Sequence, residues 1–184
     1  MKTRPATAAD SAAISEILIQ SWGSHIAVAH GVAYDATTLP AILAEEDDRI
    51  VGLLTYNLQD EEMEVVTLDA PVPHLGVGTA LLNAAAEAAK AAGAHRLWLI
   101  TTNDNVDALR FYQRRGMRIV DVRPGAVDES RKLKPSIPAT GAYDIPLHDE
   151  LVLELRLPDQ PSSDKPATDE PSADKPATDE PSGV

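Results

Sequence analysis

The sequence contains no cysteine among its 184 residues. This absence excludes a disulfide framework, a thiolate-bound zinc site and a cysteine nucleophile. Positive charge is also scarce, because 16 lysines and arginines stand against 29 acidic residues and give a formal net charge of −13. Electrostatic binding to nucleic acid or to anionic lipid is therefore not expected.

Long apolar runs are missing as well. No uninterrupted stretch approaches the roughly 18 residues that a membrane-spanning helix needs. The N-terminal residues MKTRPATAADSAAIS contain no apolar core of a signal peptide. The histidines lack the spacing of metal ligands, since His25 and His30 are five positions apart. We therefore expect a cytoplasmic protein that has no membrane partner and binds no metal ion.

The C-terminal residues form a repeat, because PSSDKPATDE at 161–170 recurs as PSADKPATDE at 171–180. From residue 158 onward, Val184 is the one aliphatic residue larger than alanine, and aromatic residues are absent. Such a segment buries too little apolar surface to offset the entropy of ordering it. We predict a folded domain at residues 1–157 and a disordered, acidic, proline-rich tail at residues 158–184, which is either a solvating appendage or an interaction arm.

Hydrophobic periodicity within residues 1–157 predicts antiparallel strands first, and then alternating helices and strands. Asp10 is expected to cap the first helix, and Asp47-Asp48 to form a hairpin turn. This order predicts an α/β fold with a mixed, mostly antiparallel sheet of about seven strands flanked by helices. The expected strands are 1–4, 40–46, 49–58, 62–70, 96–101, 117–123 and 150–157; the expected helices are 10–20, an irregular 21–39, 78–92 and 105–115; and 124–149 is a long connection.

A glycine turn, LGVGT at residues 75–79, joins a predicted strand to the following helix. Glycines let a ligand approach the backbone closely, and the free N–H groups of a first helical turn favour a phosphate. The turn is not a P-loop, since no Lys-Ser/Thr pair follows Gly78. It is not a complete dinucleotide fingerprint either, because Leu81 occupies the place of the third glycine. A phosphate-binding loop and a plain strand-to-helix connection both fit these residues.

Two segments, PHLGVGTALL at 73–82 and NVDALRFYQRRGM at 105–117, follow each other with one predicted strand between them. In both, the sequence resembles the GNAT superfamily of acyl-CoA-dependent N-acetyltransferases. The pyrophosphate loop of that family reads Arg/Gln-x-x-Gly-x-Gly/Ala, and its second motif reads Asn-x-x-Ala-x-x-x-Tyr-x-x-x-Gly-Phe. The matching residues are Gly76 and Gly78 in the first motif, and Asn105, Ala108, Tyr112 and Gly116 in the second.

Two positions depart from the pattern of the family. Pro73 stands where Arg or Gln is usual, and Met117 stands at the aromatic position. Proline supplies neither a backbone N–H nor the polar side chain that supports the loop. This departure leaves open an acyl-CoA-binding regulatory module with little turnover. A third interpretation is an interaction protein that acts through its acidic tail.

The resemblance implies transfer of an acetyl group from acetyl-CoA to a primary amine of a small molecule or peptide, by direct attack and without a metal ion. In the family, a glutamate four residues before the strand position that binds the acetyl carbonyl acts as base, and Glu64 stands four residues before Leu68. By the same resemblance, Tyr112 protonates the departing CoA thiolate. The main-chain N–H groups of Leu68 and Ala70 stabilise the oxyanion. The implied cofactor-binding residues are Leu68, Ala70, Leu75, Gly76, Val77, Gly78, Thr79, Asn105 and Ala108.

Three of these residues also fit simpler roles. Glu64 fits a solvated strand carboxylate, Tyr112 fits a core aromatic residue, and Asn105 fits a helix cap. Strict alternation along the strand places Asp69 on the opposite face from Glu64, which makes Asp69 a weaker candidate for the base. Besides the amine acceptor, a second copy of the chain in a homodimer is left open as a partner.

Overall fold

The computed structural model describes residues 1–71 and 76–158, so the predicted tail, apart from Pro158, lies outside the described residues. In chain order the elements are β1 (Lys2–Pro5), η1 (Ala8–Asp10), α1 (Ser11–Trp22), β2 (Ile26–Ala29), β3 (Val32–Asp35), β4 (Ala41–Glu46), β5 (Arg49–Gln59), β6 (Glu62–Asp69), α2 (Val77–Ala91), β7 (Arg96–Thr102), α3 (Val106–Gln113), β8 (Arg118–Arg123), α4 (Ala126–Leu133), η2 (Ala142–Asp144) and β9 (Glu150–Arg156).

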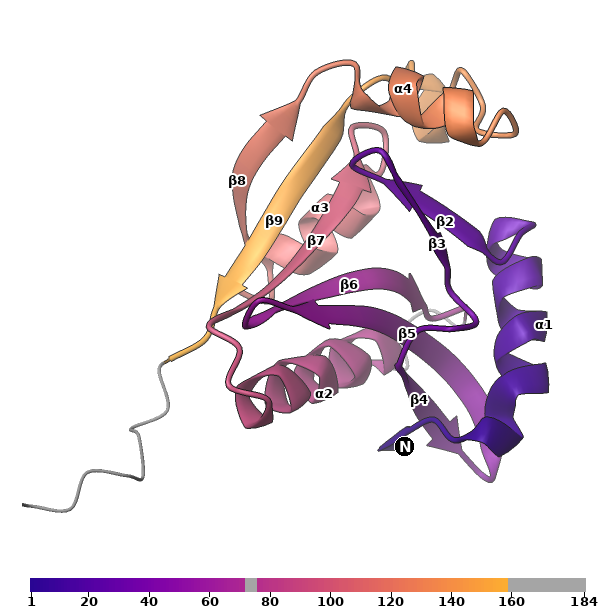
Figure 1. Ribbon diagram of the computed structural model, residues 1–184, viewed down its shortest axis with the longest axis vertical. Coiled ribbons are helices and arrows are strands. Elements are labelled where there is room, and N and C mark those ends of the chain that lie inside the picture. The colour runs from indigo at the N-terminus through magenta and orange to yellow at the C-terminus, as the bar shows by residue number, and fades with distance from the viewer. Residues whose placement is uncertain (72–75, 159–184) are drawn as a thin grey trace, which may run out of the picture.

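The described strands form a seven-stranded sheet in the order β1-β4-β5-β6-β7-β9-β8 and a separate two-stranded sheet, β2-β3 (Figure 1). Among them, β6 and β7 are the one parallel pair. The predicted α/β fold with a mixed, mostly antiparallel sheet is therefore confirmed. Among the described helices, none is long and apolar enough to cross a membrane.

Helices cover both faces of the sheet (Figure 1). On one face, α2 buries Leu81 and Leu82 against strand residues such as Leu54 and Leu97, and α3 packs on the same cluster. On the other face, α1 buries Ile14 and Leu18 against alternate residues of β4 and β5. The two cores use opposite sides of the same strands, which is the pattern expected for a sheet that is covered on both faces.

The sheet divides where β6 and β7 diverge. Their pairing runs from Glu62–Arg96 to Val65–Leu99, although β6 continues to Asp69 and β7 continues to Thr102. Beyond Val65, β6 and β7 are therefore no longer paired with each other along their facing edges. The divergence opens the middle of the sheet beside the N-terminal end of α2.

A bulge in β6 changes which side chains share a face. Thr67 pairs with Thr55 of β5, but Val65 pairs with the next residue, Tyr56, so Val66 is an extra residue. An extra residue reverses the alternation of side chains beyond it. Asp69 therefore lies on the same face as Glu64, and the expectation that it lies on the opposite face is wrong.

Two other expectations are corrected. Residues 21–39 do not form an irregular helix, because α1 ends at Gly23, which has a φ of +66°, and β2 and β3 form a hairpin. Asp10 precedes α1 but does not cap it, since its carboxylate accepts hydrogen bonds from Arg4 and Thr7. The long connection at residues 124–149, for which no element is predicted, contains two short helices, α4 and η2. The hairpin turn at Asp47-Asp48 is confirmed, with φ values of +49° and +60°.

Candidate active site

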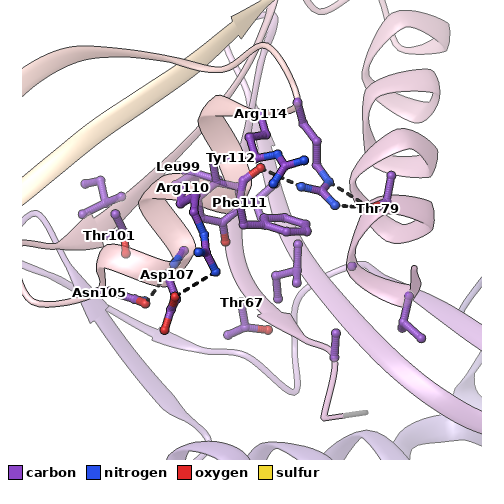
Figure 2. Close-up of a pocket in the computed structure, with 18 of the residues that line it drawn as sticks. Thr67, Thr79, Leu99, Thr101, Asn105, Asp107, Arg110, Phe111, Tyr112 and Arg114 are labelled. Carbon is purple, nitrogen blue, oxygen red and sulfur yellow. Dashed lines mark hydrogen bonds and ion pairs between the residues drawn. The ribbon is translucent and has the colours of Figure 1, made fainter. Parts of the chain in front are cut away.

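A cavity of about 910 Å³ lies where β6 and β7 diverge (Figure 2). Five elements contribute to its wall: the end of β6, the first turn of α2, the end of β7, helix α3, and Trp22 at the end of α1. The volume suits a large organic ligand. Of the residues expected to form the site, the cavity wall includes Leu68, Ala70, Gly76, Val77, Gly78, Thr79, Asn105, Ala108 and Tyr112.

The N-terminal turn of α2 presents backbone donors to this cavity. Gly76 precedes the helix with a φ of +73°, and no side chain among the described residues caps the turn. A Cβ atom on Gly78 would lie 3.0 Å from Cζ of Phe111, so glycine at this position allows α2 and α3 to pack closely. Uncapped N–H groups at the positive end of a helix dipole favour an anion. Leu75 and Pro73 lie outside the described residues.

Arginines on and beside α3 add positive charge to the cavity wall. Arg115 donates from Nε to Oγ1 of Thr79 over 2.9 Å, and its guanidinium carbon lies 3.6 Å from the centre of the Phe111 ring. Arg110 and Arg114 line the same cavity. The sequence analysis missed these cations, although the Arg-Arg pair directly before Gly116 was a usable signal.

Tyr112 points into the cavity from α3 (Figure 2). Burial, followed by the charge of Asp69, raises the pKa of its hydroxyl to about 12. The ring also packs edge-to-face on Phe111, with 5.2 Å between the ring centres. Tyr112 therefore holds its proton at neutral pH and contributes to packing at the same time.

Asn105 acts as a helix cap. Its Oδ1 accepts a hydrogen bond from the N–H of Ala108 over 3.3 Å, and both residues also line the cavity. Met117, at the aromatic position of the motif, is buried in the core shared by α2 and the sheet. Capping thus explains Asn105 structurally, and its backbone N–H and C=O are also engaged within the protein, with Thr102 and Leu109.

Glu64 is buried rather than solvated, with 4% of its surface exposed. Its Oε2 accepts a hydrogen bond from the Tyr34 hydroxyl over 2.9 Å, and its Oε1 lies 3.1 Å from Nε2 of His30. These contacts attach the β2–β3 hairpin to the sheet. Glu64 is not among the described residues that line the cavity, so the structure does not bring it together with Tyr112 there.

Asp69 lies on the same face as Glu64, between Leu68 and Ala70, which line the cavity, although Asp69 itself does not line it. Nε1 of Trp22 donates to its Oδ1 over 2.8 Å, and burial raises the pKa of its carboxyl, an effect that the nearby polar side chains of Trp22, Ser21 and Thr67 partly oppose. The sequence analysis ranked Asp69 low because a bulge depends on the partner strand and leaves no clear mark in one sequence.

In this chain, the central strands β6 and β7 of a mixed sheet diverge beside a helix that a glycine precedes. This combination is characteristic of the acyl-CoA N-acyltransferase fold. The family model described as "Acetyltransferase (GNAT) family" matches residues 13–117, more than half of the chain. The chain therefore belongs to the GNAT acetyltransferase family, as its motifs indicated. Membership of this family supports acetyltransferase activity.

The chain is also similar to individual proteins over most or half of its length. "Uncharacterized protein YxbD" of Bacillus subtilis (strain 168) is 39% identical over 141 residues, which are 76% of this chain and 89% of that protein. Streptothricin acetyltransferase of Streptomyces lavendulae is 30% identical over 90 residues, 48% of each chain. A GNAT family acetyltransferase from Elizabethkingia anophelis, solved with acetyl-CoA bound, has a TM-score of 0.65 at 20% identity and aligns with 85% of this chain and 97% of that chain.

Proposed function

We propose that this protein transfers the acetyl group of acetyl-CoA to a primary amine of a small molecule or peptide. The observation that carries the proposal is the cavity in the divided sheet, whose wall includes both Tyr112 and the first turn of α2, which no described side chain caps. An anion-binding helix end and a proton donor at one cavity suit a phosphate-bearing thioester.

The residues present fit acetyl-CoA in two ways. The N–H groups of residues 76–79 would hold the pyrophosphate, and Arg115 would add a charge at the same turn through its contact with Thr79. The wall formed by Asn105 and Ala108 would hold the pantetheine arm. Arg115, just after α3, would thus supply positive charge to a loop in which this chain has Pro73 instead of the family's usual arginine or glutamine.

The bound thioester supplies a carbonyl carbon that an amine can attack. An unperturbed alkylammonium with a pKa near 10.4 is protonated at pH 7, so a nearby carboxylate assists by accepting a proton. Glu64 is the base implied by the family pattern, and Tyr112 holds the proton that the leaving sulfur needs. The N–H groups of β6 beyond Val65, including those of Leu68 and Ala70, lie where β6 no longer pairs with β7 and would stabilise the oxyanion.

The acceptor is proposed to be cationic. The net charge of −13 favours the approach of a positively charged amine over a neutral or anionic one. The name of the Streptomyces relative indicates that it acetylates streptothricin, so this antibiotic belongs in the panel of acceptors to be tested. The panel also includes spermidine, lysine and an alanine-terminated peptide.

Acetyl-CoA is expected to stabilise the protein against unfolding. At 100 times its dissociation constant, a ligand that binds the folded state alone adds about 2.7 kcal/mol to the free energy of unfolding. The measurement is the melting temperature with acetyl-CoA, with CoA and with buffer, followed by thiol release across the amine panel. No shift at millimolar acetyl-CoA would contradict the proposal. A shift without thiol release from any amine would instead favour the binding module with little turnover.

Replacing Arg115 by methionine is expected to weaken acetyl-CoA binding by about tenfold, the equivalent of one charge-assisted contact. Methionine keeps a linear stem of similar length but removes the guanidinium, which lies beside Thr79 and over the Phe111 ring. The measurement is the Kd for acetyl-CoA at low and high salt, and the loss should shrink at high salt because the charge is then screened. Arg118→Met, on the exposed strand β8, is the matched control. Equal affinities of the two variants would contradict a role for Arg115 at the phosphates.

A further inference from the structure

Asp69 carries one carboxylate oxygen, Oδ2, that accepts no hydrogen bond from any residue in the described part of the chain. The residue ends β6, and 5% of its surface is exposed. Oδ1 accepts from the indole of Trp22, but Oδ2 is enclosed and has no hydrogen-bond partner among the residues that the structure describes. An enclosed acceptor without a donor costs free energy, and such a group in a native protein commonly has a functional explanation. A donor N–H brought by a ligand would remove this cost.

The surroundings of Asp69 connect it to the cavity. Its neighbours Leu68 and Ala70 line the wall, as does its hydrogen-bond partner Trp22. Tyr112, on the α3 side, is close enough that the charge of Asp69 contributes to its raised pKa. A carboxylate and the proposed proton donor therefore act on each other at the place where the sheet divides.

Glu64 is equally buried but differs from Asp69 in its hydrogen-bond partners. The Tyr34 hydroxyl occupies Oε2 of Glu64, and Nε2 of His30 lies at Oε1. Both oxygens of Glu64 therefore have partners from the β2–β3 hairpin, and, unlike Asp69, Glu64 is not flanked on both sides by residues at the mouth of the divided sheet, although neither carboxylate itself lines the described cavity. These contacts suit a residue that positions the hairpin over the sheet, and they leave it poorly placed to receive a proton.

We propose that Asp69, rather than Glu64, accepts the proton of the attacking amine, an assignment that rests on the acetyl transfer proposed above. The amine nitrogen forms a bond to the thioester carbonyl carbon, the bond from carbon to sulfur breaks, and one N–H proton passes to Oδ2 of Asp69. Tyr112 gives its hydroxyl proton to the departing sulfur. Proton exchange with solvent then returns Asp69 to the carboxylate and Tyr112 to the phenol. The net transfer is one proton from nitrogen to sulfur, and an acceptor that arrives as an ammonium ion first releases one proton to solvent.

The electrostatic setting of Asp69 suits this role. Burial raises the pKa of its carboxyl, and a base becomes more effective as its pKa approaches the working pH. The groups that face it are the indole of Trp22 and the hydroxyl of Ser21 from α1, the hydroxyl of Thr67 from β6, and the titratable phenol of Tyr112 from α3. Among the described residues, no cation lowers the pKa of Asp69. No positive charge from these residues therefore holds its carboxylate in the ionised form.

The test replaces Asp69 by asparagine and measures thiol release from acetyl-CoA with the best acceptor of the panel, whether streptothricin, spermidine, lysine or the alanine-terminated peptide. Loss of a positioned base lowers kcat/KM for the amine on the order of 10²-fold. Stabilisation by acetyl-CoA is retained. Asp60→Asn, the same chemical change in the exposed turn between β5 and β6, keeps the wild-type rate. The rival variant, Glu64→Gln, loses less activity than Asp69→Asn.

The melting temperature provides a second reading that does not depend on turnover. Asparagine keeps an acceptor for Trp22 and removes a charge that burial disfavours, so the melting temperature of Asp69→Asn stays level or rises. A fall in melting temperature together with lost acetyl-CoA binding would show a merely structural role and overturn the proposal. Wild-type kcat/KM in Asp69→Asn beside a large loss in Glu64→Gln would overturn it while leaving the proposed function intact. A wild type that acetylates no amine would overturn both.

Discussion

Replacement of Tyr112 by phenylalanine is expected to lower turnover on the order of 10²-fold and to leave acetyl-CoA affinity nearly unchanged. The substitution removes one oxygen and keeps the ring that packs on Phe111. The hydroxyl acts on the charge that develops on the departing sulfur, so its loss falls on kcat rather than on ground-state binding. The thiolate of CoA is already a fair leaving group, which places the effect near the lower end of the range for a positioned acid.

The two roles of Tyr112 are separated by a pair of variants. If the residue only packs, Tyr112→Phe is nearly silent and Tyr112→Ala lowers the melting temperature. If it donates a proton, Tyr112→Phe already loses turnover at an unchanged melting temperature. Tyr56→Phe, which removes a hydroxyl from a partly buried tyrosine of β5, is the matched control. A wild-type kcat for Tyr112→Phe would contradict the role as acid.

The pKa of Tyr112 also predicts a feature of the pH profile. Burial and the charge of Asp69 raise the pKa of the phenol to about 12, and a proton donor works only below its pKa. Tyr112 therefore stays protonated throughout the neutral range. An alkaline loss of activity near pH 8 would have to come from another group and should persist in the residual activity of Tyr112→Phe.

The fold could be predicted where local chemistry agreed with the final structure. Paired acidic residues at Asp47-Asp48 indicated a hairpin, and Gly93, with a φ of +78°, ends α2 as its position suggested. The hairpin at residues 26–35 was missed because its short strands, IAVA and VAYD, contain alanines that fit a helix equally well. These strands gain their stability from the contacts of His30 and Tyr34 with the sheet, and such tertiary contacts are not visible in local sequence.

Some residues of the candidate site could be predicted from the sequence and others could not, because tertiary contacts are not visible in local sequence. The glycines and α3 residues come from contiguous motifs, and the structure places them around one cavity. Asp69 and Trp22 are 47 positions apart, and their contact depends on a bulge that the pairing of β5 with β6 creates. Residues assembled by strand register could therefore not be found by alternation alone.

Replacement of Gly76 by valine is expected to weaken acetyl-CoA binding by tenfold or more, about 1.4 kcal/mol at least. Gly76 precedes α2 with a φ of +73°, and its position puts any side chain beside the N–H groups that would hold the pyrophosphate. A branched side chain there blocks the close approach of a phosphate to the backbone. The measurement is the Kd for acetyl-CoA, compared with the melting temperature of the free protein.

The strain that valine adds to the backbone must be separated from its effect on the ligand, and α2 offers the control at its other end. Gly93 has a φ of +78°, and a Cβ atom at either glycine meets nothing within 4 Å among the described residues. Left-handed backbone costs an L-residue roughly 1–2 kcal/mol, so Gly76→Val and Gly93→Val should lose about the same few degrees of melting temperature. Gly93 does not line the described cavity, so Gly93→Val keeps its acetyl-CoA affinity. Equal affinities in the two variants would contradict phosphate binding at the glycine turn, because strain alone would then account for both.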